Sequence, residues 1–187
     1  KFYFAYNSPY AFLANRRIVE ALAPTGVAIA YKPVAKPRAG GAPDFKSPRV
    51  RYIVEDIRRF TRADGITLNA GPFADSRMAC RGFLFAGEQG EGMAYHNRIY
   101  QARWLEKADI ADHATLSDIA VALGLDRDAF LAALEDDSPQ AAALEQSNAE
   151  AEADGVFGFP FFVYKDQHFW GNDRIEWLVE EIERDGD

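Results

Sequence analysis

The chain has 187 residues, of which 48% are hydrophobic, enough for one sizeable core or for a domain that carries a large insertion. Its 21 Lys and Arg residues against 29 Asp and Glu give a formal charge of −8, which argues against nucleic acid as a partner because phosphate binding needs a cationic face. No apolar run approaches the ~20 residues that cross a bilayer, so we expect no membrane partner either.

The N-terminal segment predicts a β-α-β unit. Phe2–Tyr6 is short and apolar throughout, which is typical of a strand buried on both faces. Ser8 is a good N-cap and Pro9 suits the first helical position, so we expect a helix that runs to about Leu22. Val27–Tyr31 is interpreted as the second strand. This order predicts two parallel strands joined by a right-handed crossover.

The central part of the chain carries helical signals only. A Pro- and Gly-rich loop from Pro33 to Asp44 leads into segments with the i, i+3, i+4, i+7 spacing of one helical face. Thr115 and Asp118 are interpreted as a capping box. The other signals are an apolar stripe from Val50 to Phe60, a start at Asp75-Ser76, a helix over Met93–Leu105, a cap at Asp126, and an Ala-rich helix from Ser138-Pro139 to Gly155. We therefore expect an all-helical insertion.

The β pattern returns near the C-terminus. Phe161–Tyr164 and His168–Trp170, with Lys165–Gln167 as the turn between them, predict a hairpin. Asn172 or Asp173 is expected to cap a last helix, whose apolar residues repeat every three or four positions.

Neither end of the chain can bury its strands alone, so we predict that the two ends join in one four-stranded mixed sheet. The order β-α-β at one end and β-β-α at the other is the thioredoxin topology, interrupted by helices. The expected fold is therefore α/β and thioredoxin-like. Its thioredoxin-like domain comprises residues 1–33 and 156–187, and the inserted helical domain comprises residues 34–155.

Two short motifs are candidates for ligand binding. Ser8 lies where unpaired N–H groups and the positive end of a helix dipole converge, which stabilises anions and thiolates in particular. It is equally a common cap, and both roles can coexist because a capping hydroxyl can donate to a thiolate. Pro160 at a strand start indicates an edge, a turn or a cis bond. A cis bond would leave the backbone N–H and C=O of Phe159 free for an extended peptide-like ligand. Asp173 is either a plain cap or a partner for a ligand's ammonium group.

Other polar residues favour simpler interpretations. His96, His113 and His168 lie far apart without the spacing of metal ligands, so we expect no metal site. Cys80 is the only cysteine and is interpreted as a small buried apolar residue. Because one cysteine cannot form an internal disulfide, a reducing compartment such as the cytoplasm is expected. Arg49 precedes a helical stripe and is either solvated or placed to meet a carboxylate.

Taken together, these pieces resemble the DsbA-like thioredoxin superfamily, in its 2-hydroxychromene-2-carboxylate isomerase and kappa-class glutathione transferase branch. The resemblance covers nearly the whole chain, and the order and spacing of its motifs carry it. The motifs are Phe2–Ala14 at the front, Tyr100–Trp104 and Asp109–Asp112 in the insertion, and Gly155–Pro160 and Phe169–Arg174 at the back.

The resemblance implies glutathione as the cofactor. In this family the hydroxyl at Ser8 hydrogen-bonds the glutathione sulfur, and the residue before the cis-proline pairs with the cysteinyl part. Ser8 also stands where disulfide oxidoreductases keep their first cysteine, so dithiol exchange is not expected. The implied glutathione-binding residues are Ser8, Pro9 and Tyr10 at the helix start, Arg49, Phe159 and Pro160, and Asn172 and Asp173 for the γ-glutamyl end.

The function that the resemblance implies is a glutathione-dependent isomerase. Its thiolate would add reversibly to a conjugated aromatic small acid, with Ser8 as the catalytic residue. A kappa-like glutathione transferase or peroxidase, which would release the adduct instead, is the alternative enzyme. A family member without a redox dithiol that only binds peptides by strand addition is the alternative of another class. Relatives of this kind are commonly dimers, so a homodimer is expected.

Overall fold

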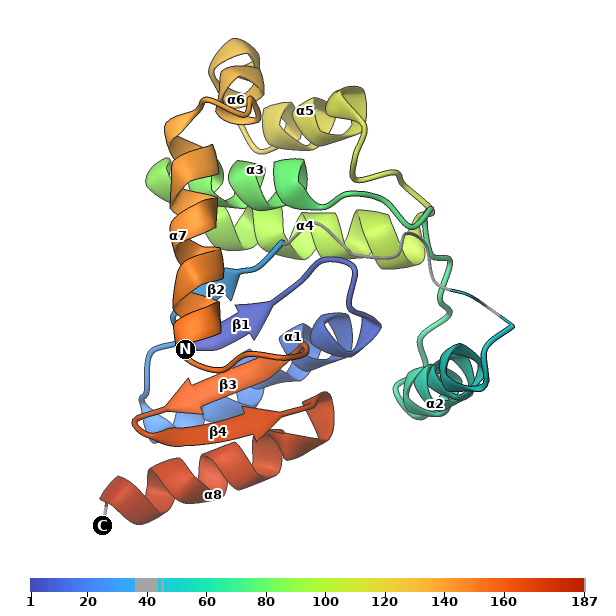
Figure 1. Cartoon of the computed structure of the whole chain (residues 1–187), viewed down its shortest axis with the longest axis vertical. Helices are drawn as coiled ribbons and strands as arrows, with labels where there is room; N and C mark the ends of the chain where they lie inside the picture. The colour runs from blue at the N-terminus through green and yellow to red at the C-terminus, as the bar shows by residue number, and fades with distance from the viewer. Residues whose placement is uncertain (36–43, 45, 187) are drawn as a thin grey trace.

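The chain folds around a four-stranded mixed sheet, described here from a computed structural model for residues 1–35, 44 and 46–186 (Figure 1). The strand order is β2-β1-β3-β4. β1 pairs in parallel with β2 and antiparallel with β3, and β3 pairs antiparallel with β4. The predicted sheet that joins both ends of the chain is thus confirmed. The strands are β1 (Phe2–Phe4), β2 (Tyr31–Pro33), β3 (Phe161–Tyr164) and β4 (Gln167–Trp170).

The second strand lies later in the chain than Val27–Tyr31, so that prediction was wrong. Pairing with β1 begins where the Ala30 carbonyl accepts the Phe2 N–H (2.8 Å). It continues past Pro33, because the Val34 N–H donates to the Phe4 carbonyl (2.9 Å). Since β2 is an edge strand, Pro33, its last residue, needs no N–H for a further neighbour. The predicted loop after Pro33 falls partly on residues 36–43, outside the described residues.

Helices cover both faces of the sheet (Figure 1). α1 (Pro9–Leu22) and α8 (Ile175–Gly186) pack on one face. α7 (Pro139–Ala153) lies against the other face beside β2, where its Ser147 hydroxyl donates to the Pro33 carbonyl (2.7 Å). The remaining helical elements are α2 (Pro48–Ala63), α3 (Arg77–Glu88), α4 (Gly92–Leu105), α5 (His113–Ala122), α6 (Arg127–Ala133) and the 3-10 turns η1 (Ala23–Thr25) and η2 (Asn172–Arg174).

Several predicted helix starts are confirmed by their caps. The side chains of Ser8, Asp126 and Ser138 each accept the backbone N–H three residues on, at 3.2, 2.8 and 3.0 Å. The capping box at Thr115 was wrong, because α5 begins earlier. The Asp112 carboxylate accepts both the N–H and the hydroxyl of Thr115 (2.9 Å each), so Asp112 is the cap.

The C-terminal helix also begins differently from the prediction. Asn172 and Asp173 form the turn η2, and neither side chain caps it. Gly171 precedes the turn with φ +119°, a conformation that favours glycine. The turn of the hairpin is also shorter than the three residues predicted, because Gln167 belongs to β4 and pairs with Tyr164 of β3.

The larger cluster of buried residues joins the sheet to the helical insertion. It includes Phe4 of β1, Tyr6 just after it, Phe12 of α1, Tyr100 of α4 and Ile175 of α8. In the part of the chain that the structure describes, no helix is both long and apolar enough to cross a bilayer. Across residues 1–35, 44 and 46–186 no three His, Cys, Asp or Glu side chains are grouped as metal ligands would be.

Candidate functional site

Ser8 lies at the first turn of α1 and makes two hydrogen bonds. Its Oγ accepts the Ala11 N–H (3.2 Å) as the helix cap and donates to the Phe159 carbonyl (2.9 Å). The first turn of α1 contains no acidic residue, so no side-chain charge there opposes the positive end of the helix dipole. Ser8 is half-buried, and its hydroxyl contacts Phe159, which the sequence also indicated as a candidate for ligand binding.

The Phe159–Pro160 peptide bond is cis, one of the three arrangements that the sequence left open. The expectation that the Phe159 carbonyl would be free was wrong, because the Ser8 hydroxyl occupies it. The carbonyl of Pro160 accepts the Gly171 N–H (3.1 Å). Residues before β3 are thereby tied to those after β4, which brings three separate candidate segments to one end of the sheet.

Asn172 and Asp173 follow directly on Gly171 at this end. The Asn172 side chain is buried, with 2% of the residue exposed, and its Nδ2 has no hydrogen-bond partner among the described residues. A buried amide donor left unpaired costs about 1–3 kcal/mol, so it indicates a group that a ligand acceptor would satisfy. Asp173 is exposed and forms an ion pair with Arg174 (3.3 Å).

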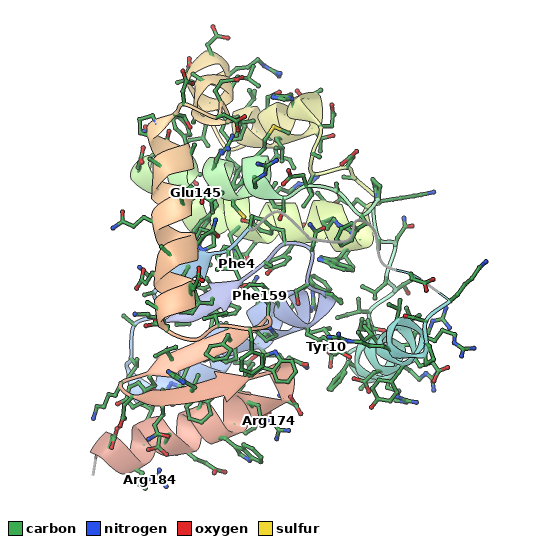
Figure 2. The ribbon with its side chains drawn as sticks, in the orientation of Figure 1. Phe4, Tyr10, Glu145, Phe159, Arg174 and Arg184 are labelled. Atoms are coloured by element: carbon green, nitrogen blue, oxygen red, sulfur yellow. The ribbon has the colours of Figure 1, made fainter. Side chains whose placement is uncertain are left out.

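Tyr10 connects the helix start to α2. Its hydroxyl donates to Asp56 (2.9 Å), and its ring meets the edge of Phe60 with 6.3 Å between centroids. Figure 2 shows Tyr10 on the side of α1 that faces α2. Burial, and then the hydrogen bond to Asp56, raises the pKa of the Tyr10 hydroxyl, with a smaller contribution from the charge of Asp173. Tyr10 therefore links the start of α1 to α2.

Arg49 is exposed in the first turn of α2. It precedes Asp56 by seven residues, which is close to two helical turns, so both residues lie on one stripe of α2 about 10 Å apart along the axis. Because Asp56 meets Tyr10, that stripe faces the helix start. Arg49 as a glutathione-binding residue stays a prediction.

Sequence reasoning missed how α4 holds the loop before Ser8. The Tyr100 hydroxyl donates to the Ala5 carbonyl (3.4 Å), and the Trp104 Nε1 donates to the Tyr6 carbonyl (3.0 Å). Both donors are buried and lie more than ninety residues from their acceptors. No local pattern in the chain indicates such a contact. The helical insertion therefore positions the Ser8 turn.

A second missed feature is an exposed aromatic pair near Phe159. The rings of Phe157 and Trp170 meet edge to face at 4.8 Å, and 71% and 53% of the two residues are exposed. Gly158 lies against the indole, since a Cβ there would be 2.5 Å from Nε1 of Trp170. A glycine at this position therefore allows the Phe159 segment to approach Trp170 closely.

The chain is similar to known proteins over nearly its full length. The model of a family described as a DSBA-like thioredoxin domain matches residues 1–183. The 2-hydroxychromene-2-carboxylate isomerase of Pseudomonas putida is 30% identical over 181 residues, which covers 93% of this chain and 89% of the relative. A solved 2-hydroxychromene-2-carboxylate isomerase structure superposes with a TM-score of 0.82 at 26% identity, covering 98% of this chain and 93% of that one.

A more distant solved structure shares the fold. The cytosolic disulfide reductase DsbM from Pseudomonas aeruginosa, solved with GSH, has a TM-score of 0.69 at 19% identity and covers 98% of each chain. The family model spans all but the last few residues of the present sequence. The chain therefore belongs to the DSBA-like thioredoxin domain family.

Proposed function

We propose that the protein is a glutathione-dependent isomerase of the 2-hydroxychromene-2-carboxylate isomerase type, acting on a conjugated aromatic small acid. One observation carries the proposal. The turn where a dithiol oxidoreductase would need a cysteine holds Ser8, whose hydroxyl lies at a helix start and against the residue before a cis-proline. The similarity to isomerases over more than nine-tenths of the chain supports the reaction class.

The residues around Ser8 fit glutathione as a bound thiol. The unpaired Nδ2 of Asn172 would donate to the γ-glutamyl carboxylate, and the exposed carboxylate of Asp173 would meet the γ-glutamyl ammonium group. The backbone of Phe159 would pair with the cysteinyl part. Arg49 would add a positive charge beside this tripeptide, which carries a net negative charge.

When bound, glutathione supplies a thiolate that adds reversibly to a conjugated double bond, which allows the bond to rotate. The protein contributes the conditions for that thiolate. Ser8 must turn its hydroxyl proton from the Phe159 carbonyl towards the sulfur, and the N–H groups of the first turn of α1 favour negative charge there. A free thiol has a pKa of ~8.5, and lowering it by about one to two units makes most of it thiolate near neutral pH.

We also propose a homodimer in a reducing compartment such as the cytoplasm. The lone cysteine, Cys80, supports the compartment: it is buried, and burial raises the pKa of its thiol, so it is neither a disulfide partner nor a reactive nucleophile. Sedimentation of the purified chain tests the dimer. A single monomeric species at micromolar concentration would contradict it.

The test of the proposed function is turnover of 2-hydroxychromene-2-carboxylate with and without glutathione, followed by absorbance and by mass spectrometry of the product. We expect isomerisation that depends on glutathione, with glutathione recovered unchanged. A product that carries a glutathionyl group would indicate a transferase instead. Calorimetry that detects no glutathione binding would indicate a non-catalytic binding module.

A further inference from the structure

Arg103 on α4 has a buried guanidinium that contacts no carboxylate among the residues that the structure describes. Only 3% of the residue is exposed, and no carboxylate in the described part of the chain forms an ion pair with it. Its Nη1 donates to the Gly71 carbonyl (2.6 Å), and its Nε makes a long hydrogen bond to Asn7 Oδ1 (3.5 Å). Its guanidinium also lies over the Trp104 ring (4.5 Å to the centroid), so its contacts in the described part of the chain are with neutral groups, whereas buried charges are normally paired with an opposite charge.

A second buried arginine shows the usual arrangement. Arg81 on α3 is 6% exposed, and it pairs with Asp136 (2.7 Å) and donates to the Leu134 carbonyl (2.5 Å). Its role is explained by those contacts, which hold the α6–α7 connection to α3. Arg103 instead donates its hydrogen bonds to neutral oxygens, so these bonds leave its positive charge without a negative partner.

The charge of Arg103 lies behind the turn that leads to Ser8. Asn7, which it contacts, precedes Ser8 directly, and the Asn7 Nδ2 donates to the Ala74 carbonyl (2.6 Å), which fixes the Asn7 side chain. Burial lowers the pKa of Arg103 and the charge of Asp109 partly offsets this, but a guanidinium stays protonated in proteins. A positive charge therefore persists roughly 10 Å from the Ser8 hydroxyl, given 3.8 Å between neighbouring Cα atoms and the lengths of the side chains.

We propose that Arg103 is a positioning residue of the thiol site: it holds Asn7 and the turn before Ser8, and its buried charge, which no carboxylate among the described residues neutralises by an ion pair, favours the thiolate form of the thiol bound there. This inference rests on the proposed function. The charge adds to the roughly half unit of positive charge at the start of α1. Because Arg103 is buried, solvent and salt screen it poorly.

The expected effect is measurable as a pKa of the bound thiol. Two unit charges about 10 Å apart at an effective dielectric constant of about 20 to 40 change that pKa by about 0.6 to 1.2 units. Arg103→Gln, which removes the charge but keeps a hydrogen-bonding side chain, should raise the pKa by that amount. Arg103→Lys, which keeps the charge, should leave it within about 0.2 units of the native value.

The experiment titrates the ultraviolet absorbance of the thiolate of glutathione bound to each variant, with Arg81→Gln as the matched loss of a buried arginine. A rise of the bound-thiol pKa in Arg103→Gln, but not in Arg103→Lys or Arg81→Gln, supports the inference. An unchanged pKa in Arg103→Gln, or equal rises in Arg103→Gln and Arg103→Lys, would overturn it. No glutathione binding to the native chain would overturn the proposed function as well, so the two failures are distinguishable.

A salt titration of the native chain tests the same inference without any variant, should Arg103→Gln fail to fold. Salt screens exposed charges such as Arg49 but screens a buried charge poorly, so the bound-thiol pKa should stay at least about 0.5 units below that of free glutathione as the salt concentration rises several-fold. A bound-thiol pKa that reaches that of free glutathione at high salt would assign the whole effect to exposed charges and would overturn the inference.

Discussion

Replacing Ser8 by Ala should lower both the stability of the fold and the catalytic rate, because one hydroxyl serves both, and the two effects can be measured separately. Loss of the cap on the Ala11 N–H costs about 1 kcal/mol of stability, and loss of the donor to the Phe159 carbonyl costs about 1 kcal/mol more. The free energy of unfolding should therefore fall by about 2 kcal/mol. A hydrogen bond to a charged group contributes about 1.5–3 kcal/mol, so kcat/KM should fall by roughly 10- to 100-fold.

Ser138 offers a matched control at the other end of the molecule. It also precedes a proline at a helix start, accepts the Ala141 N–H (3.0 Å) and donates to the Ala133 carbonyl (2.9 Å). Ser138→Ala should therefore lose a similar free energy of unfolding, measured by urea denaturation, while kcat/KM with saturating glutathione stays native. Equal losses of activity in the two variants, or none in Ser8→Ala, would refute the reasoning.

Three further predictions concern other parts of the chain. Gly82→Ala should lower the free energy of unfolding, measured by urea denaturation, by about 1–3 kcal/mol, because its Cβ would lie 2.3 Å from the Tyr95 hydroxyl. Gly87→Ala on the same helix should raise the free energy of unfolding by about 0.5–1 kcal/mol, because its Cβ meets nothing within 4 Å. Burial lowers the pKa of His96 to about 3, so on acidification the unfolded state binds a proton at His96 before the folded state does. The free energy of unfolding should be at its full value above about pH 6.5 and should fall by a few kcal/mol as the pH drops towards about 3. The fall should be less steep in His96→Gln. Tyr10→Phe should speed hydrogen exchange in α2, because the donor to Asp56 is lost, with a fall of at most about 1 kcal/mol in global stability.

Each of these has an outcome that contradicts it. Equal effects of the two glycine substitutions would show that the space around Gly82 adjusts without cost. Parallel acid denaturation of native and His96→Gln protein would show that His96 does not titrate as a buried group. Unchanged exchange in α2 of Tyr10→Phe would show that contacts other than the hydroxyl hold that helix.

The sequence predicted those parts of the site that depend on neighbouring residues. A Ser-Pro pair after a strand signals a capped helix start, and Pro160 before a strand signals an unusual backbone, and both are present. The order of strands and helices was enough to predict that both ends of the chain join in one sheet, and the family resemblance assigned Ser8 and Phe159 to one ligand. These features arise from propensity, capping and topology, which act over a few residues or through general rules of connection.

Other features depend on contacts that no local pattern encodes. The Ser8 hydroxyl is bound to the Phe159 carbonyl across 151 residues, and Arg103 reaches Asn7 across 96. The position of the second strand was wrong because pairing with β1, rather than the apolar run before it, decides where the ladder lies. Tertiary packing decided these cases. The start of α5 was wrong for a local reason, because the Asp112 carboxylate, three residues before Thr115, accepts its N–H.

The central claim is that Ser8 turns from the Phe159 carbonyl to stabilise an external sulfur anion. A crystal structure of the protein with bound glutathione tests it most directly. We predict that the sulfur lies within hydrogen-bond distance of the Ser8 Oγ, with the Phe159 carbonyl released. A sulfur that points elsewhere, while the hydroxyl still donates to Phe159, would contradict the account.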